Sequence, residues 1–351
     1  MLNGVKAMKS LQISSTLKKT KVKPRKYQVF LSLIIILIII TFLSLFLGAE
    51  KLNVVKAFSD IINHIPSKDA RILKYVRLPR TLAGLLAGAA LASAGVIIQS
   101  VLSNPLAAPS TIGVNAGAGL TVAIFCALAP SALSWVPIAA QVGAFIGVAI
   151  VLSISEHTSA SKITLVLAGV AVSGIFNAGI DAVVTFVPDA LNGYSDFRIG
   201  GLSGVSMKQL SPAVYIIIIG LIIALSLHNE MDILMLGTEQ AQSLGLPAKK
   251  LRVIFLALAA LLAGSAVSFC GLIGFVGLLV PHMMRQLIEE ESGPLILGSA
   301  LGGAALLCGC DLLSRLIFAP YELPVGVVMS LAGGPFFLFL LRKKGVHNRY
   351  D

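Results

Sequence analysis

Cysteine and histidine are the side chains of this sequence best able to bind a metal or act as a nucleophile, and their spacing indicates neither role. The four cysteines lie within or beside apolar runs and form no C-x-x-C pair: Cys126, Cys270, Cys308 and Cys310. The five histidines are scattered without ligand spacing: His64, His157, His228, His282 and His347. The chain also lacks the G-x-x-x-x-G-K-[ST] motif by which a P-loop ATPase binds phosphate. We therefore expect no catalytic residue, metal site or cofactor.

The longest polar interruption in the C-terminal half of the chain is a stretch at residues 228–252, between two almost wholly apolar segments. Six of its residues are charged: Glu230, Asp232, Glu239, Lys249, Lys250 and Arg252. A bilayer core cannot hold so many unpaired charges, so we expect this stretch to lie in water at a membrane surface.

The same stretch carries signals for two short helices. Thr238 is expected to be the N-cap of one, with Glu239 in its first turn, Gly245 at its C-terminal end and Pro247 just beyond. A second helical piece at 230–236 would precede it. Both carry apolar side chains that water would not favour: Ile233, Leu234, Leu236, Ala241 and Leu244. These side chains pack either back onto their own bundle or against another protein.

Composition places the chain in a membrane. Of its 351 residues, 56% are hydrophobic and 12% charged, with a mean hydropathy of +0.92, whereas soluble proteins have about 25% charged residues. Eight of the 27 basic residues precede Tyr27. By the positive-inside rule this basic segment holds the N-terminus in the cytoplasm, and nucleic acid is not expected as a partner.

Ten apolar segments are long enough to span a bilayer, which predicts an all-α polytopic membrane protein. They cover residues 29–47, 81–102, 112–129, 136–154, 163–187, 212–227, 253–269, 272–287, 295–313 and 325–341. An even number puts both termini in the cytoplasm. We thus expect a basic tail at 1–27, a transmembrane domain at 28–342 with 228–252 on its cytoplasmic side, and a cytoplasmic tail at 343–351.

The outer loop at 48–80 departs from the charge rule, because it carries seven basic residues against three acidic ones. The basic residues are Lys51, Lys56, Lys68, Arg71, Lys74, Arg77 and Arg80. Either these charges have a use on the outer face, or the membrane tolerates a long amphipathic loop.

Small residues recur at four-residue spacing and predict close helix packing: Gly84/Gly88, Gly113/Gly117, Gly143/Gly147 and Gly298/Gly302. Proline and glycine predict broken helices at Asn104-Pro105, Ala108-Pro109, 277–281 and 333–335. Broken backbone at membrane depth must be buried in protein or line a water-filled cavity, which favours a translocation path. Asp181 is the clearest charge within a span, and either contacts substrate or protons or lies near a helix end, paired inside the bundle.

Four sequence blocks resemble the FecCD family, the permease subunits of ABC importers for iron-siderophores, haem and vitamin B12. They are RLPRTLAGLLAGAALASAGVIIQSVLSNPLAAPSTIGVNAGAGL at 77–120, and then LGTEQAQSLGLP, GLIGFVGLLVPHMMR and ELPVGVVMSLAGGPFFLFLL in family order. The combination is specific and covers much of the chain from Arg77 onward.

The resemblance implies partners: a second permease, either the same chain or a paralogue, two ATP-binding subunits below, and a substrate-binding protein above. It also implies that the segment after the sixth span contacts the ATPase through Leu236, Gly237, Thr238, Glu239, Ala241, Leu244, Gly245, Leu246 and Pro247. Arg77, Arg80 and Arg315 correspond to arginines that receive acidic residues of the binding protein, although Arg77 and Arg80 could instead only anchor a helix at the headgroups. The path would be lined by the fifth and tenth spans, including Asn177, Asp181, Gly333, Gly334 and Pro335.

The sequence is thus identified as a multi-pass permease of a bacterial cytoplasmic membrane, in contact with lipid, that imports an iron(III)-siderophore and leaves ATP hydrolysis to a partner. Import of haem or cobalamin is the alternative within the same class. A secondary carrier without an ATPase is the alternative from another class.

Overall fold

The computed structural model describes residues 26–347 apart from 49, 51, 158–161, 289 and 318, and this part is helical without strands. Ten helices correspond to the ten predicted spans: α2 (Lys26–Phe46), α5 (Leu78–Leu102), α6 (Val114–Leu128), α7 (Val136–His157), α8 (Lys162–Phe186), α10 (Met207–Ser226), α13 (Ala248–Cys270), α14 (Val276–Leu287), α15 (Ser292–Ile317) and α16 (Val325–His347). Seven described helices are long and apolar enough to cross a membrane. The prediction of an all-α polytopic membrane protein is confirmed. Most of the basic tail lies outside the described residues.

Short helices lie at the two ends of the bundle. At one end are α3 (Val54–Ile62) and α4 (Lys68–Ile72), and at the other are α11 (His228–Met235) and α12 (Thr238–Ser243). A π-helical turn, η1 (Leu73–Arg77), joins α4 to α5 in one continuous helix. A further short helix, α9 (Ala190–Ile199), has no counterpart among the predicted elements.

Helix α5 forms the centre of the bundle, where it contacts α13, α14 and α15. In its most apolar window 83% of the residues are buried, against 17% in α2. Small residues allow the close approach: a Cβ atom added at Gly88 would overlap the backbone of Gly303, and one at Gly117 would overlap the backbone of Gly143. The helix-packing role predicted for these glycine pairs is therefore confirmed for α5 against α15 and for α6 against α7.

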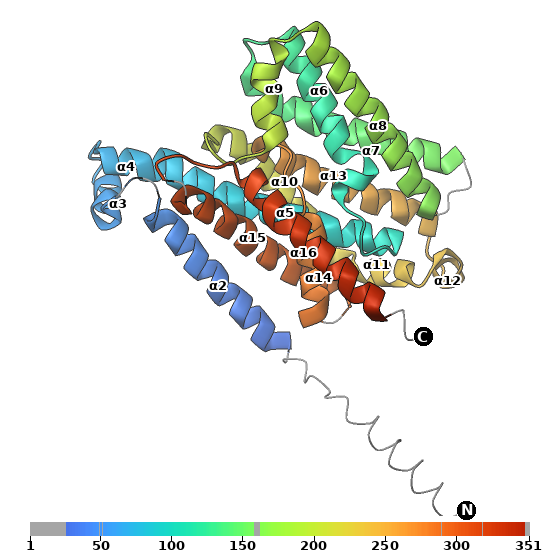
Figure 1. Cartoon of the computed structure of the whole chain (residues 1–351). Coiled ribbons are helices and arrows are strands. Elements are labelled where there is room, and N and C mark those ends of the chain that lie inside the picture. Colours follow the sequence, from blue (N-terminus) through green and yellow to red (C-terminus); the bar gives the residue numbers. More distant parts are fainter. Residues whose placement is uncertain are drawn as a thin grey trace, which may run out of the picture.

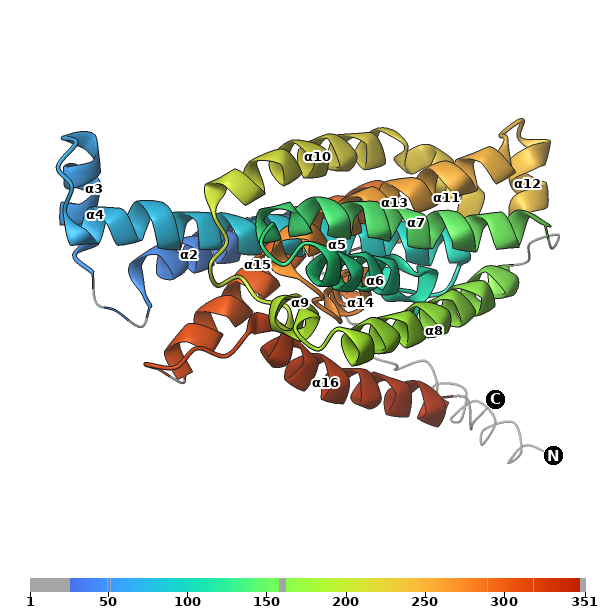
Figure 2. The ribbon, with the colours of Figure 1, turned by 90° about the horizontal axis from the view of Figure 1, so that it is seen from above.

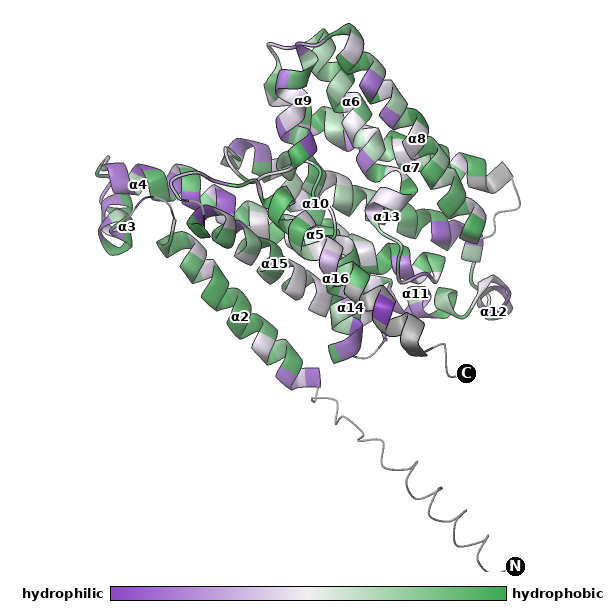
Figure 3. Ribbon diagram, viewed as in Figure 1, coloured by the Kyte–Doolittle hydropathy of each residue, from purple (hydrophilic) through white to green (hydrophobic). Residues whose placement is uncertain are grey.

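Three of the described spans turn most of their surface away from the bundle. In the apolar windows of α2, α8 and α10 only 17%, 28% and 28% of the residues are buried, and hydrophobic residues run along α2 and α8 in Figure 3. Apolar surface of this extent is stable only against lipid or another apolar protein surface.

Of the predicted backbone breaks, only the one around Pro105 and Pro109 is present. There, α5 ends at Leu102, with Ser103 as its C-cap, and the chain resumes in a 3₁₀ turn, η2 (Pro109–Ile112). The prediction was wrong at 277–281 and 333–335, which are helical parts of α14 and α16. A proline removes only one helix hydrogen bond, and neighbouring groups in a packed membrane bundle can replace it. The second break instead lies at 271–275, between α13 and α14.

Polar contacts join the first and ninth predicted spans at the α11 end. Lys26 Nζ, at the start of α2, lies 3.1 Å from Glu291 Oε2, next to the start of α15. The Ser292 N–H, at the start of α15, donates to Asp232 Oδ1 of α11 over 2.9 Å. The C-terminal end of α16 points toward the same end of the molecule in Figures 1 and 2. The start of α2 and the C-terminal end of α16 therefore lie on the α11 side of the bundle.

Candidate functional site

The polar stretch 228–252 forms a two-helix projection that is anchored to the bundle. On α11, Met231 is fully buried and Leu234 is 2% exposed, so the inner face of this helix belongs to the core. Asp232 fixes the same helix to the start of α15 through its bond to Ser292. The position of α12 is therefore set by packed helices and not by a free loop.

Helix α12 ends as predicted and begins differently. Gly245 has a φ of +83°, and two bonds close the C-terminal turn: Leu246 N–H to the Ala241 carbonyl at 3.0 Å, and Gly245 N–H to the Gln242 carbonyl at 2.9 Å. This pair of bonds is a Schellman motif, for which glycine is preferred because it adopts positive φ without strain. The expected N-cap at Thr238 is wrong, since Gly237 holds that position. The Thr238 hydroxyl instead accepts a 2.9 Å hydrogen bond from Arg252 Nη2.

Two leucines remain uncovered on this projection. Leu236 is 63% exposed and Leu244 is 62% exposed, whereas Ala241 is fully buried. The alternative that these helices pack back onto the bundle is thus correct for the inner residues only. Of the other residues predicted to contact an ATPase, Glu239, Gly245 and Pro247 are exposed, and Gly237, Thr238 and Leu246 are half-buried.

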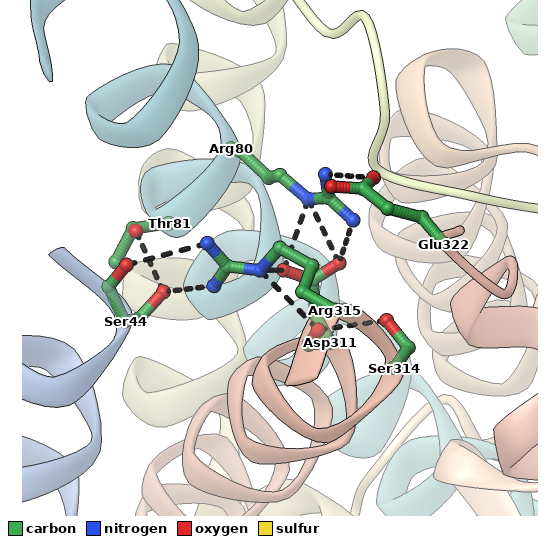
Figure 4. Close-up of polar contacts among 7 residues, drawn as sticks. All are labelled: Ser44, Arg80, Thr81, Asp311, Ser314, Arg315 and Glu322. Carbon is green, nitrogen blue, oxygen red and sulfur yellow. Dashed lines mark hydrogen bonds and ion pairs between the residues drawn. The ribbon is translucent and has the colours of Figure 1, made fainter. Parts of the chain in front are cut away.

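At the opposite end of the bundle, charged side chains form a buried cluster around Asp311, drawn in Figure 4. Arg80 Nε lies 3.0 Å from Asp311 Oδ1, and Arg80 Nη1 lies 2.6 Å from Glu322 Oε2. Arg315 Nε lies 3.2 Å from Asp311 Oδ2, and its Nη2 donates to the Ser44 hydroxyl over 2.8 Å. The cluster therefore joins α2, α5, α15 and the loop before α16.

Arg77 lies beside this cluster and caps the C-terminal end of α2. Its Nη1 donates to the Leu45 and Phe46 carbonyls over 2.8 and 2.7 Å, and its Nη2 donates to the Glu50 carbonyl. The last carbonyls of a helix have no hydrogen-bond partner within the helix, so a guanidinium at this position can donate to them. Its positive charge also interacts favourably with the negative end of the helix dipole.

This burial corrects the expectation that the three arginines face an incoming protein. Arg77, Arg80 and Arg315 lie at helix ends on the α3 and α4 side of the bundle, and they are only 4%, 6% and 3% exposed. The sequence did not identify Asp311 or Glu322 as their partners. Glu322 is the one member of the ion-pair cluster with a substantially exposed side chain, at 32%.

The residues predicted to line a path do not share one environment. Asn177 and Asp181 are exposed and one turn apart on α8. On α16, Gly333 is buried against Phe275, while Gly334 and Pro335 are more accessible. Within the described part of the chain, no three His, Cys, Asp or Glu side chains gather as metal ligands would.

A backbone junction at the outer start of α16 was missed from sequence. Gly201 N–H donates to the Cys270 carbonyl at 2.9 Å, Leu272 N–H to the Phe197 carbonyl at 2.9 Å, and Gly326 N–H to the Gly200 carbonyl at 3.1 Å. These bonds connect the end of α9, the break after α13 and the first turn of α16. A possible sequence signal was the run Gly200-Gly201 together with Gly271, since Gly200 and Gly271 have φ values of +73° and +69°.

Comparison with known proteins agrees with this architecture. The FecCD transport family model matches residues 36–343. The chain is 35% identical to an Fe(3+)-citrate import system permease of Bacillus subtilis, covering 93% of this chain and 98% of that protein. It is 36% identical to the hemin transport system permease of Yersinia pestis, covering 92% and 97%. A solved chain of a metal-chelate type ABC transporter in an inward-facing conformation superposes with a TM-score of 0.80 at 26% identity, over 91% of this chain and 99% of that one.

Proposed function

The chain belongs to the FecCD transport family and is a permease subunit of a metal-chelate type ABC importer, and from this premise we propose that it imports an iron(III)-siderophore. A relative named for Fe(3+)-citrate import supports iron chelates as the substrate class. An equally similar relative named for hemin makes haem the second candidate. A relative named for cobalamin import makes cobalamin the third. Family membership excludes the secondary carrier that the sequence alone left open.

Uptake into proteoliposomes tests the substrate. The chain would be reconstituted with its ATP-binding subunit and binding protein, and offered radioactive iron as a hydroxamate or citrate complex. We expect ATP-dependent accumulation of one iron chelate that excess hemin or cyanocobalamin does not inhibit. Accumulation of hemin or cobalamin, with none of the iron chelates, would contradict the proposal.

The second part of the proposal is that α11 and α12 bind the ATP-binding subunit. Its main support is the pair of exposed leucines, Leu236 and Leu244, on a segment that packed helices hold in place. Apolar side chains at such exposed positions gain free energy if a cleft on a partner removes them from water. Shifts of α11 would then be transmitted to α15 through Asp232, and shifts of α12 to α13 through Arg252.

Leu244→Asp tests this contact without disturbing the core, because Leu244 is 62% exposed. Placing a carboxylate in an apolar contact is expected to weaken binding of the purified ATP-binding subunit at least about thirtyfold, or ~2 kcal/mol. Leu244→Met keeps an apolar side chain of similar size and serves as the matched control. Equal affinities of the two variants would show that Leu244 lies outside the contact.

The third part concerns the second permease subunit and the path. We propose that α8 and α16 both face a second permease, either this chain or a paralogue. Helix α8 would contribute Asn177 and Asp181, and α16 would contribute the face near Gly333, Gly334 and Pro335. The exposure of the polar side chains Asn177 and Asp181 on α8 supports this assignment, because such side chains within a span rarely face lipid. Disulfide cross-linking of an Asn177→Cys variant between two copies would support a homodimer.

The fourth part is that a binding protein docks at the end that carries the charge cluster. In this conformation the burial of Arg77, Arg80 and Arg315 prevents their direct contact with a binding protein. They would instead stabilise the helix ends that form the docking surface. Arg80→Glu would then lower the amount of inserted protein, because a third carboxylate would join Asp311 and Glu322. Normal insertion with loss of binding-protein affinity alone would instead indicate direct docking by Arg80.

A further inference from the structure

An apolar groove of about 540 Å³ opens at the outer end of α2. Phe42 and Phe46 of α2 form one wall, and Val55 and Phe58 of α3 form another. Lys74, in the π-helical turn before α5, is the one charged residue among those that line it. The groove therefore combines an apolar interior with a single cation.

Helix α3 has the pattern of a helix at a membrane surface. Val55, Phe58 and Ile62 lie along one stripe and are 77%, 62% and 64% exposed. An exposed stripe of this kind is unfavourable in water and favourable at the boundary between headgroups and acyl chains. Below the groove, α2 continues with exposed apolar residues such as Ile35 and Ile39, so the groove is continuous with a lipid-facing surface.

The charges beside the groove favour an anion. Lys74 lines the groove, and together with Arg71 it also lines an adjoining pocket that contains the Asp60 carboxylate. Both basic residues are exposed, and among the residues that the structure describes no carboxylate, Asp60 included, forms an ion pair with either. Lys74 Nζ lies 5.5 Å from the centroid of the Tyr75 ring, and that exposed ring is of the type found at bilayer interfaces. Lys68, by contrast, is already paired with Glu50.

We propose that this groove binds an anionic phospholipid of the outer leaflet, with an acyl chain between Phe42 and Phe58 and its phosphate at Lys74 and Arg71. The groove explains two features together: basic residues kept on the outer side against the usual charge bias, and an amphipathic α3 next to them. The bound lipid fills the gap between α2 and α3 and so supports the outer end of α2, which Arg77 caps.

Native mass spectrometry of the purified chain, released from nanodiscs of phosphatidylglycerol or phosphatidylcholine, tests the proposal. We expect phosphatidylglycerol to be retained preferentially. Lys74→Gln should lower its retention about fivefold, the equivalent of the ~1 kcal/mol that one basic residue contributes near an anionic surface. Lys208→Gln removes an exposed lysine at the start of α10, away from the groove, and is the matched control.

A second variant blocks the groove without changing charge. Val55→Trp places a large ring in the groove, and folding should be unaffected because Val55 is 77% exposed. It should reduce retention of both lipids. Equal retention of the two lipids by the unmodified chain would overturn the proposal, as would a Val55→Trp variant that binds phosphatidylglycerol normally. Conversion of a dimer to a monomer by Val55→Trp would assign the groove to contact between copies of the chain and would likewise overturn it.

Discussion

At the residue scale, Asp311 is the side chain on which the outer charge cluster depends. It is 1% exposed and lies within ion-pair distance of both Arg80 and Arg315. A buried arginine is tolerated only when it is paired and hydrogen-bonded, because desolvation of an isolated charge costs several kcal/mol. The cluster therefore gives these arginines a structural role in joining α2, α5 and α15.

Asp311→Asn should destabilise the folded chain strongly. The substitution leaves two buried guanidinium groups without a carboxylate between them, a change that costs about 3–5 kcal/mol in comparable buried pairs. The measurement is the midpoint of thermal unfolding in detergent. Glu322→Gln is the matched control, and since its side chain is 32% exposed we expect a loss below about 1 kcal/mol. Similar unfolding midpoints for the two variants would contradict the claim that the charge cluster depends on Asp311.

The arginines also show where reading single residues from sequence fails. The charge bias of the 48–80 loop singled out Arg77 and Arg80, whereas only the family resemblance singled out Arg315. Their burial was not predictable, because Arg80 and Asp311 are 231 positions apart and only the folded bundle brings them together. Exposure of Leu236 and Leu244 likewise depends on which face of each short helix meets the bundle.

At the element scale, close contact between α5 and α15 depends on residues without side chains. Gly303→Ala should destabilise the chain by about 1–3 kcal/mol, because the new Cβ would overlap the Gly88 backbone, which cannot move aside as a flexible side chain could. Gly309→Ala, on the same helix, is the control: its Cβ would lie 3.5 Å from the end of the Ile40 side chain, an ordinary contact. Thermal unfolding in detergent compares the two. An equal or larger loss for Gly309→Ala would contradict this packing argument.

The long helices were predictable because a bilayer requires continuous apolar segments with internally satisfied backbone groups. The short elements were not. Helix α9 has too little apolar periodicity to stand out, and α3 was assigned to an amphipathic loop. Pro281 and Pro335 were interpreted as breaks, although each helix continues through its proline. Whether a proline interrupts a helix is decided by the tertiary contacts that replace its lost hydrogen bond.

At the scale of the whole molecule, the proposed orientation places α3 outside the cell and α12 in the cytoplasm. An Asn63→Cys substitution, just after α3, should react with impermeant thiol reagents in intact cells, whereas Ser243→Cys on α12 should react only after the membrane is opened. Both parent residues are exposed, and the four native cysteines are buried, so background labelling should be low. Labelling of Ser243→Cys from outside would contradict the proposed orientation.

The class of transporter could be predicted from sequence, because its motifs lie in the helices and turns that define the bundle. The substrate could not be, since the described part of this chain has no ligand cluster that identifies one. The internal partners of the outer arginines became visible only in the folded structure.

The most direct test of the central claim is ATP-driven uptake by a reconstituted complex of this permease, its ATP-binding subunit and its binding protein, with uptake and ATP hydrolysis measured together. For the unmodified chain, we predict accumulation of iron chelate that requires ATP and the ATP-binding subunit. With Leu244→Asp, uptake should be lost while the permease remains folded and inserted, and with Leu244→Met it should be retained. Uptake that proceeds without the ATP-binding subunit, or that Leu244→Asp leaves unchanged, would contradict coupling through α11 and α12.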